Sequence, residues 1–311
     1  MKQFIKKILL FSLPIIVGLT IIFFTNTDRE FCYNYIKGDC DTRGKLFYKR
    51  IETKSVGVDY LFVGSSKTMN GINDGLIEDS LNKYSKNKLR LYNAGYCRFG
   101  RNLDFLLCKE FSKNNNLKKI FVEVRADEST TSHPMFAFLA NSREILQGIP
   151  ALNGKITSEI YNHSLMNLNY LRCELNLEKK EKNKYKLELH GYNNIDRVME
   201  KELLEEFYKE ELNKNKTIDK DALEYRYSRF YLSRIKKLCD KKNIELNFIF
   251  MPSFGNTTKL PAFKEEYEQW GKVIVGPDSI FNNKSYWKDV AHFNTAGATA
   301  FSNFLAKELA R

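Results

Sequence analysis

The sequence predicts an α/β fold with a mainly parallel sheet, a helical insertion and an N-terminal transmembrane helix. Short apolar runs that end at turn residues alternate with stretches of helical spacing in two parts of the chain. Strands that alternate with helices usually pair in parallel, with helices on both faces of the sheet. A long polar segment interrupts this alternation, and one apolar run lies near the N-terminus. These observations together predict the fold class.

The N-terminal segment has the features of a single-pass membrane anchor. An uncharged apolar run from Ile8 to Phe24 follows three lysines and precedes a mixed-charge segment. This charge distribution favours a cytoplasmic N-terminus. A cleaved signal peptide is the alternative, but no small-residue cleavage pattern follows the run. We therefore predict an anchor in residues 1–25, a juxtamembrane connector in 26–55, and everything after the anchor outside the cytoplasm.

The α/β domain is predicted to occupy residues 56–311. Its strands are expected at residues 58–63, 89–92, 117–124, 244–250 and 272–275. A last helix is expected from about Thr295 to Leu309, with Asn294 as its N-cap. In such sheets the reactive groups gather beyond the carboxyl ends of the strands.

Residues 128–225 break the alternation and are predicted to form a helical insertion. An amphipathic helix is expected in it, with one apolar face formed by Ile195, Val198, Leu203, Phe207 and Leu212. The apolar run 135–139 is consistent with core, lid or membrane contact. Three histidines of this insertion have no metal-ligand spacing and are predicted to be surface or loop residues: His133, His163 and His190.

Composition limits the choice of function. The formal net charge is +12, mostly from lysine, which fits either a compositional bias or attraction to an anionic envelope polymer or lipid headgroup. No nucleic-acid motif, metal signature or nucleotide-binding loop occurs, so we expect no nucleic-acid partner and no cofactor. None of the six cysteines forms a C-x-x-C pair. Spacing favours a Cys32–Cys40 bridge, with free buried thiols as the alternative.

Two turns far apart in the sequence carry the residue types of a serine nucleophile and its partners. Ser66 follows Gly64 at the end of the first predicted strand, where an adjacent helix N-terminus can stabilise an oxyanion. Asp289 and His292 form a D-x-x-H turn before the last helix. A serine hydroxyl needs a base such as histidine, and a carboxylate orients that base. Each turn alone is weak evidence, because serines and acidic residues commonly cap helices.

Together, these turns make the chain resemble the SGNH/GDSL hydrolase superfamily. The matching segments are residues 63–66, the Asn93-Ala94-Gly95 turn, and the late D-x-x-H-F-N-x-x-G-A motif that begins at Asp289. The resemblance covers roughly 58–127 and 226–311 and implies a flavodoxin-like sheet of the SGNH type. It implies Ser66 as nucleophile, with Asp289 and His292 as its partners, and oxyanion donors in the backbone N–H groups of Ser66 and Gly95.

One segment departs from the family pattern. Members usually carry an asparagine after the third strand that completes the oxyanion hole, whereas this chain has Arg125 there. Arg125 could donate to an oxyanion or pair with Glu123 or Asp127, and we favour the pairing. Glu123 and Asp127 are also alternatives to Asp289 as the orienting acid. The departure leaves an inactive, binding-only protein as an alternative.

The anchor adds a further likeness, to membrane-anchored D-alanyl transfer proteins and alginate-type polysaccharide O-acetyltransferases. This resemblance implies an extracytoplasmic acyltransferase that modifies a cell-envelope polysaccharide or teichoic-acid-like polymer. The implied partners are an acyl donor, the glycopolymer and a multispanning membrane-bound O-acyltransferase. The alternatives are a surface esterase or deacylase with the same triad, and a non-catalytic tethered binding or assembly protein.

Overall fold

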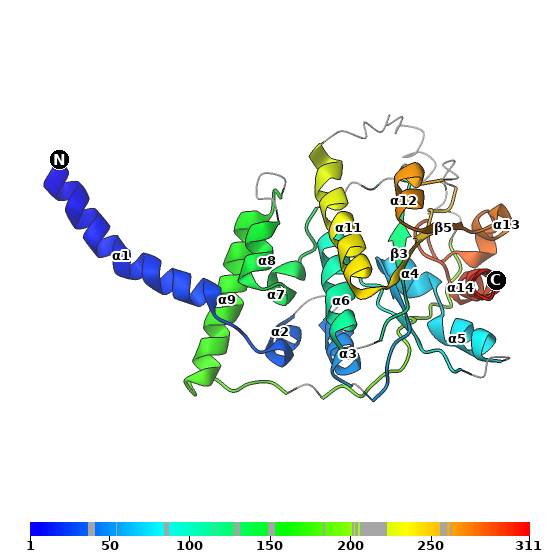
Figure 1. The fold of residues 1–311 in the computed structure, drawn as a ribbon, viewed down its shortest axis with the longest axis horizontal. Helices are drawn as coiled ribbons and strands as arrows, with labels where there is room; N and C mark the ends of the chain where they lie inside the picture. Colours follow the sequence, from blue (N-terminus) through cyan, green and yellow to red (C-terminus); the bar gives the residue numbers. More distant parts are fainter. Residues whose placement is uncertain are drawn as a thin grey trace. The chain divides into compact units, whose positions relative to one another are not determined.

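The structure is a computed structural model. It describes residues 1–36, 41–53, 55–83, 87–114, 116–126, 128, 131–148, 153–182, 184–200, 202, 205, 223–255, 260–261 and 263–311. These residues form two compact units, each built from two segments of the chain (Figure 1). The helical unit comprises residues 1–48 and 134–185, and the α/β unit comprises residues 49–133 and 186–311.

A five-stranded sheet in the order β2-β1-β3-β4-β5 is the centre of the α/β unit. Its strands are β1 (Tyr60–Val63), β2 (Leu91–Asn93), β3 (Lys119–Val124), β4 (Glu245–Phe250) and β5 (Lys272–Val275). All neighbours pair in parallel, so the carboxyl ends of the strands lie along one edge. The three inner strands are almost wholly buried, which fits their near-continuous apolar sequences. The prediction of an α/β fold with a parallel sheet is confirmed.

Helices cover both faces of this sheet. They are α4 (Ser66–Gly71), α5 (Asp74–Asn82), α6 (Arg101–Asn114), α11 (Leu223–Lys242), α12 (Lys264–Trp270), α13 (Asp278–Phe281) and α14 (Thr295–Leu309), with a 3₁₀ turn at Lys284–Tyr286. Figure 1 shows α6 and α11 packed on one side of the sheet, and α5 and α14 on the other. The aromatic core under α14 includes Phe293, Phe301 and the fully buried Trp287.

The helical unit contains α1 (Lys2–Phe24), α2 (Arg29–Tyr35), α7 (Phe136–Leu139), α8 (Ser142–Gln147) and α9 (Ile156–Glu174), and α3 (Asp41–Glu52) starts in it. Helices α2 and α3 thus lie in the segment predicted as a connector. The run 135–139 supplies α7, whose Phe136, Ala137 and Leu139 are buried, so this run belongs to the core of its unit.

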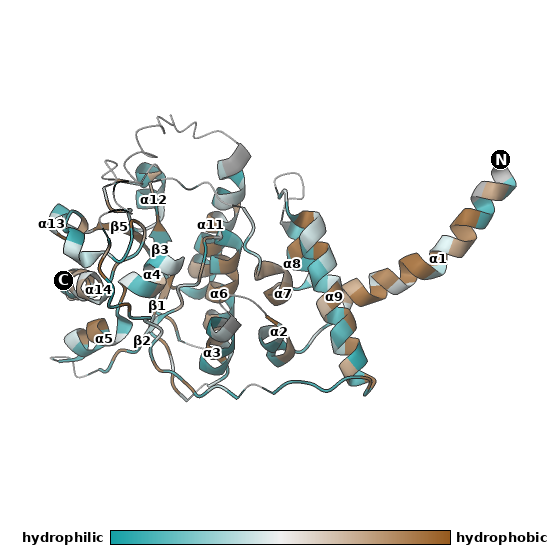
Figure 2. Cartoon of the chain, turned by 180° about the vertical axis from the view of Figure 1, so that it is seen from behind, coloured by the Kyte–Doolittle hydropathy of each residue, from teal (hydrophilic) through white to brown (hydrophobic). Residues whose placement is uncertain are grey.

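Helix α1 differs from the other helices because it exposes apolar side chains all round (Figure 2). Among the described residues it is the one helix long and apolar enough to cross a membrane, over Lys6–Phe24. Its last residues join the helical unit: the amide of buried Asn167 donates to the carbonyl oxygens of Ile22 and Phe23. The Ser142 hydroxyl also donates to the Phe23 carbonyl, at 2.6 Å.

The amphipathic helix expected from Ile195 onwards does not begin there, because residues 186–200 have no regular secondary structure, whereas the described residues Glu202 and Glu205 are helical. The backbone of this segment forms hydrogen bonds with other segments of the α/β unit instead of the bonds of a helix. Asn193 donates to the Met69 carbonyl, Met199 donates to the Trp287 carbonyl, and the Ile195 carbonyl accepts from Thr295. The remaining residues of the predicted face lie outside the described part of the chain: Leu203, Phe207 and Leu212.

Of the three histidines predicted to be surface or loop residues, His133 lies in a loop but is buried, and His163 is buried within α9. The His163 ring bonds the Ala137 carbonyl and the Ser142 hydroxyl, and the His133 ring bonds the Cys97 carbonyl. These polar partners inside the protein offset the cost of burial. His190 is partly exposed, beside Glu78.

The predicted Cys32–Cys40 bridge is also not formed, because Cys32 is a buried thiol outside any disulfide. Cys97 is bonded in a disulfide. Cys108, Cys173 and Cys239 are free and buried as well. Cys32 lies in α2, where its side chain packs within the helical unit at 4% exposure.

Candidate active site

The candidate nucleophile lies on a tight turn between β1 and α4. Ser65 is the N-cap of α4, and its hydroxyl accepts a hydrogen bond from the Lys67 N–H. Ser66 is the first residue of the helix, so its own N–H has no acceptor within the helix. A side chain at Gly64 would place its Cβ about 2.5 Å from Glu123 Cβ, so only glycine fits this turn.

Three side chains from the two ends of the α/β unit meet here in the order of a catalytic triad. The Ser66 hydroxyl lies 2.7 Å from Nε2 of His292. On the other side of the ring, Nδ1 of His292 lies 2.8 Å from an Asp289 carboxylate oxygen. The His292 and Asp289 side chains remain 23% and 28% exposed, so the site is open to solvent. With the Nδ1 proton held by Asp289, Nε2 can accept the Ser66 proton.

The turn that carries Asp289 and His292 is held by its own hydrogen bonds. The Asp289 carboxylate accepts from the backbone N–H groups of Ala291 and His292. Burial opposes its ionisation, but bonds from the His292 ring and these N–H groups outweigh burial and lower the pKa of Asp289. Asn294 caps α14 by accepting from the Gly297 N–H, as predicted. Asp289 is therefore ionised and oriented at neutral pH.

Beneath the nucleophile turn, Glu123 forms a buried anionic centre. Its carboxylate accepts from the N–H and hydroxyl groups of Ser65, from the N–H and hydroxyl groups of Thr68, and from Nε of Arg125. Burial would raise the pKa of Glu123, but the charge of Arg125 and the bonds from Thr68 and Arg125 lower it to about 2. This ionised carboxylate holds Ser65 and Thr68, and with them the first turn of α4 that carries Ser66.

Arg125 takes the pairing role that we favoured from the sequence. Its Nε lies 2.6 Å from Glu123, and its terminal nitrogen donates to the Ser65 hydroxyl. The Glu123 carboxylate accepts from Arg125 and from the turn that carries Ser66. The acid that contacts the His292 ring is therefore Asp289. Asp127, the other alternative, lies outside the described residues.

The second predicted oxyanion donor is engaged within its own turn. The Gly95 N–H donates to the side-chain oxygen of Asn93 at 2.9 Å. A Cβ at Gly95 would lie 2.4 Å from the Met69 backbone nitrogen, so the glycine allows the turn to pack against α4. Of the two backbone N–H groups predicted as oxyanion donors, the Gly95 N–H is thus already engaged. The Ser66 N–H lies beside the Ser66 hydroxyl and has no acceptor within its helix.

Lys67, next to the nucleophile, was not singled out in the sequence. Its side chain is buried, and its ammonium group donates to the Met251 carbonyl and to the Ser253 hydroxyl, at 3.2 and 2.8 Å. Burial and the charge of Arg125 lower the pKa of Lys67 to about 7. Lys67 thus ties the loop after β4 to the nucleophile turn. The sequence shows a lysine directly after Ser66, but it does not show that the side chain of this lysine is buried and reaches the loop after β4.

Among the described residues no cluster of histidine, cysteine and carboxylate side chains could hold a metal ion. Trp287 is buried and donates to the Phe281 carbonyl. No family model matches the sequence, and no curated protein is detectably similar to it.

Proposed function

We propose that this chain is a membrane-anchored serine acyltransferase of the SGNH type, which modifies a cell-envelope polysaccharide or teichoic-acid-like polymer outside the cytoplasm. The observation that carries the proposal is the chain of contacts from Ser66 through His292 to Asp289, at 2.7 and 2.8 Å. Serine, histidine and aspartate in this order form the standard device for activating a hydroxyl towards a carbonyl carbon.

The proposed reaction has two half-reactions. His292 accepts the Ser66 proton while the Ser66 oxygen bonds to the carbonyl carbon of an ester or thioester donor. The oxyanion faces the Ser66 N–H, and the donor's alcohol or thiol leaves with the proton from His292. A polymer hydroxyl then gives its proton to His292 and attacks the acyl-serine carbonyl carbon; the bond from this carbon to the Ser66 oxygen breaks, and His292 passes the proton to that oxygen, which restores Ser66. Water in place of the polymer hydroxyl makes the same site an esterase.

Two further features support an extracytoplasmic location. Helix α1 is long and apolar enough to cross a membrane, and lysines precede its apolar run. Cys97 is bonded in a disulfide, and disulfides persist in oxidising compartments outside the cytoplasm. An acyl donor delivered by a multispanning membrane-bound O-acyltransferase would fit this location.

A serine-directed fluorophosphonate probe tests the proposal. The native chain should be labelled, and Ser66→Ala and His292→Ala should not be. Ser80→Ala, the same change at an exposed serine of α5, is the matched control and should be labelled like the native chain. Equal labelling of all four proteins would show that Ser66 is not an activated nucleophile and would favour a non-catalytic tethered protein.

Product analysis then separates transfer from hydrolysis. With an acyl donor and a polymer acceptor, an acyltransferase gives acylated polymer, whereas an esterase gives free acid in the same amount with or without the polymer. The same comparison with the Ser66→Ala variant gives the background for both products.

A further inference from the structure

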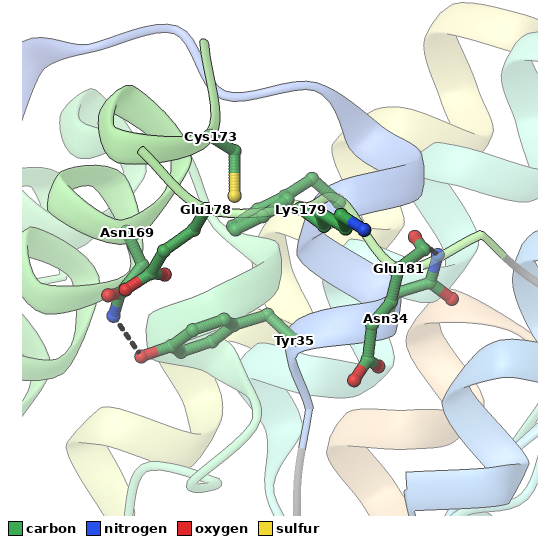
Figure 3. A pocket seen from close by; sticks show the side chains of 8 residues that line it. Asn34, Tyr35, Asn169, Cys173, Glu178, Lys179 and Glu181 are labelled. Atoms are coloured by element: carbon green, nitrogen blue, oxygen red, sulfur yellow. Dashed lines mark hydrogen bonds between the residues drawn. The ribbon is translucent and has the colours of Figure 1, made fainter. Parts of the chain in front are cut away.

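The helical unit contains a cavity that the triad does not use. It has a volume of about 210 Å³ and lies between α2, α9 and the chain that follows α9 (Figure 3). A single ordered water needs only about 10–15 Å³. The cavity is therefore large enough for part of an organic ligand.

Asn34, a residue of the wall, has a side-chain oxygen without a hydrogen-bond partner among the described residues. Asn34 is 6% exposed, and its amide nitrogen donates to the Glu181 carbonyl at 3.1 Å. Its side-chain oxygen is buried and accepts no hydrogen bond from the described residues. An unsatisfied buried acceptor costs free energy, so a ligand that donates a hydrogen bond here would be stabilised.

The other wall residues combine an aromatic surface with hydrogen-bonding groups. Phe31 and Tyr35 stack with ring centroids 5.7 Å apart, and Asn169 donates to the Tyr35 hydroxyl. Figure 3 shows the Glu178 carboxylate and the Cys173 thiol around the same space as Tyr35. Aromatic faces pack against the C–H groups of polyols and sugars, and carboxylates accept from their hydroxyls.

A second cavity adjoins the first and is basic. Its volume is about 570 Å³, and it shares Asn34 and Glu181 with the first cavity. The rest of its wall is formed by Lys45, Lys180, Lys182, Lys184 and Tyr185. Lys182 and Lys184 are exposed and form no ion pair with a described residue, so their charges can meet an anionic ligand.

We infer that these two cavities form one binding site for a phosphodiester-linked polyol or sugar. The lysines match the phosphate, and the Asn34 oxygen, the carboxylates and the aromatic faces match the hydroxyl-bearing units on either side. The wall helix α2 begins at Arg29, five residues after α1 ends at Phe24, so this ligand is met near the membrane surface. The inference deepens the proposed function, because it assigns the acidic envelope polymer a site in the helical unit.

Glycerophosphoglycerol is a suitable probe because it carries one phosphodiester between two polyols. Its binding is measured by calorimetry with the full chain bearing Ser66→Ala, in phosphatidylcholine nanodiscs. Binding to this variant does not depend on acyl transfer, so failure here and failure of the proposed function remain distinguishable. Lys182→Gln/Lys184→Gln should weaken binding about five- to tenfold, as expected for two partly exposed charged contacts. Lys237→Gln/Lys307→Gln, two exposed lysines of the α/β unit, should leave it unchanged.

Cys173 gives a reporter inside the site, because its free thiol lies on the wall of the first cavity. At ligand concentrations of about ten times the Kd, modification of Cys173 by a maleimide should slow about tenfold, because the free fraction falls to about a tenth. Replacing phosphatidylcholine with phosphatidylglycerol in the nanodiscs tests whether a lipid headgroup, and not a free polymer, is the ligand of the site. Protection by this lipid alone identifies the ligand as a headgroup of the same chemistry.

Binding or protection that is lost with Lys182→Gln/Lys184→Gln supports the site, whichever source supplies the ligand. Absence of binding and protection in both arms would overturn the inference. Equal weakening by the two lysine pairs would overturn it as well, because general charge attraction would then explain the binding. Asn34→Ala should weaken binding while the midpoint of thermal unfolding confirms that the variant is folded.

Discussion

Replacing Glu123 with glutamine should destabilise the α/β unit through the turn that carries Ser66. The pKa of Glu123 is lowered from its ordinary 4.5 to about 2 in the folded protein. At about 1.4 kcal/mol per pKa unit, this difference corresponds to about 3 kcal/mol of stability at neutral pH. Because the folded-state pKa is lowered, this contribution is complete above about pH 4.5 and is lost as the pH falls to about 2.

Urea unfolding in detergent, followed by the fluorescence of the two tryptophans, Trp270 and the buried Trp287, measures the effect. The free energy of unfolding of Glu123→Gln should be about 3 kcal/mol lower than that of the native chain at pH 7. The two should converge as the pH approaches about 2. Glu245→Gln on neighbouring β4 is the matched control: its side chain is 54% exposed beside Lys119, and such ion pairs contribute about 0–1 kcal/mol. A pH-independent difference, or one no larger than in the control, would refute the carboxylate's role.

Three further predictions concern the groups around Ser66. Asp289→Asn should slow fluorophosphonate labelling about 10²- to 10⁴-fold, because His292 loses its orienting anion, and a smaller effect in timed labelling would argue against a triad. Ser65→Ala should cost about 1–3 kcal/mol in urea unfolding, because Glu123 and Arg125 lose a buried partner, yet Ser66 should still be labelled. Complete loss of labelling in the folded Ser65→Ala variant would point to Ser65 as the nucleophile. The native chain should gain stability as the pH rises from about 7 towards 10.5, because the unfolded state then retains a proton that buried Lys67 has released. Lys67→Met should remove this gain from the thermal unfolding midpoints, and an unchanged gain would exclude Lys67 as its source.

The sequence predicted those parts of the fold that depend on local patterns. Each strand is a short apolar run, and the turn at Ser66 and the turn at His292 contain their own glycine or capping residues. Parallel pairing places strand ends along one edge, which is why two turns far apart in sequence could be expected to meet. Ser66 follows β1 directly, whereas α13 and the 3₁₀ turn separate His292 from β5, so the place of His292 beside Ser66 also depends on tertiary packing.

The role of Glu123 could not be read in this way, because it depends on register. Val63 pairs with Val122, which brings Glu123 beside Gly64 and under the next turn. A single sequence does not specify which strands are neighbours or how they are aligned. For the same reason, the segment around Ile195 had helical periodicity, but its backbone groups found tertiary partners instead.

The junction between α1 and the rest of the helical unit makes the end of this apolar helix part of the folded protein. The carbonyl oxygens of Ile22 and Phe23 satisfy Asn167 and Ser142, which are both buried. A truncation that begins after Phe24 would remove both carbonyl acceptors of the buried Asn167 amide nitrogen and would leave the Ser142 hydroxyl with His163 alone. Biochemical work on a truncated chain should therefore retain the last turn of α1.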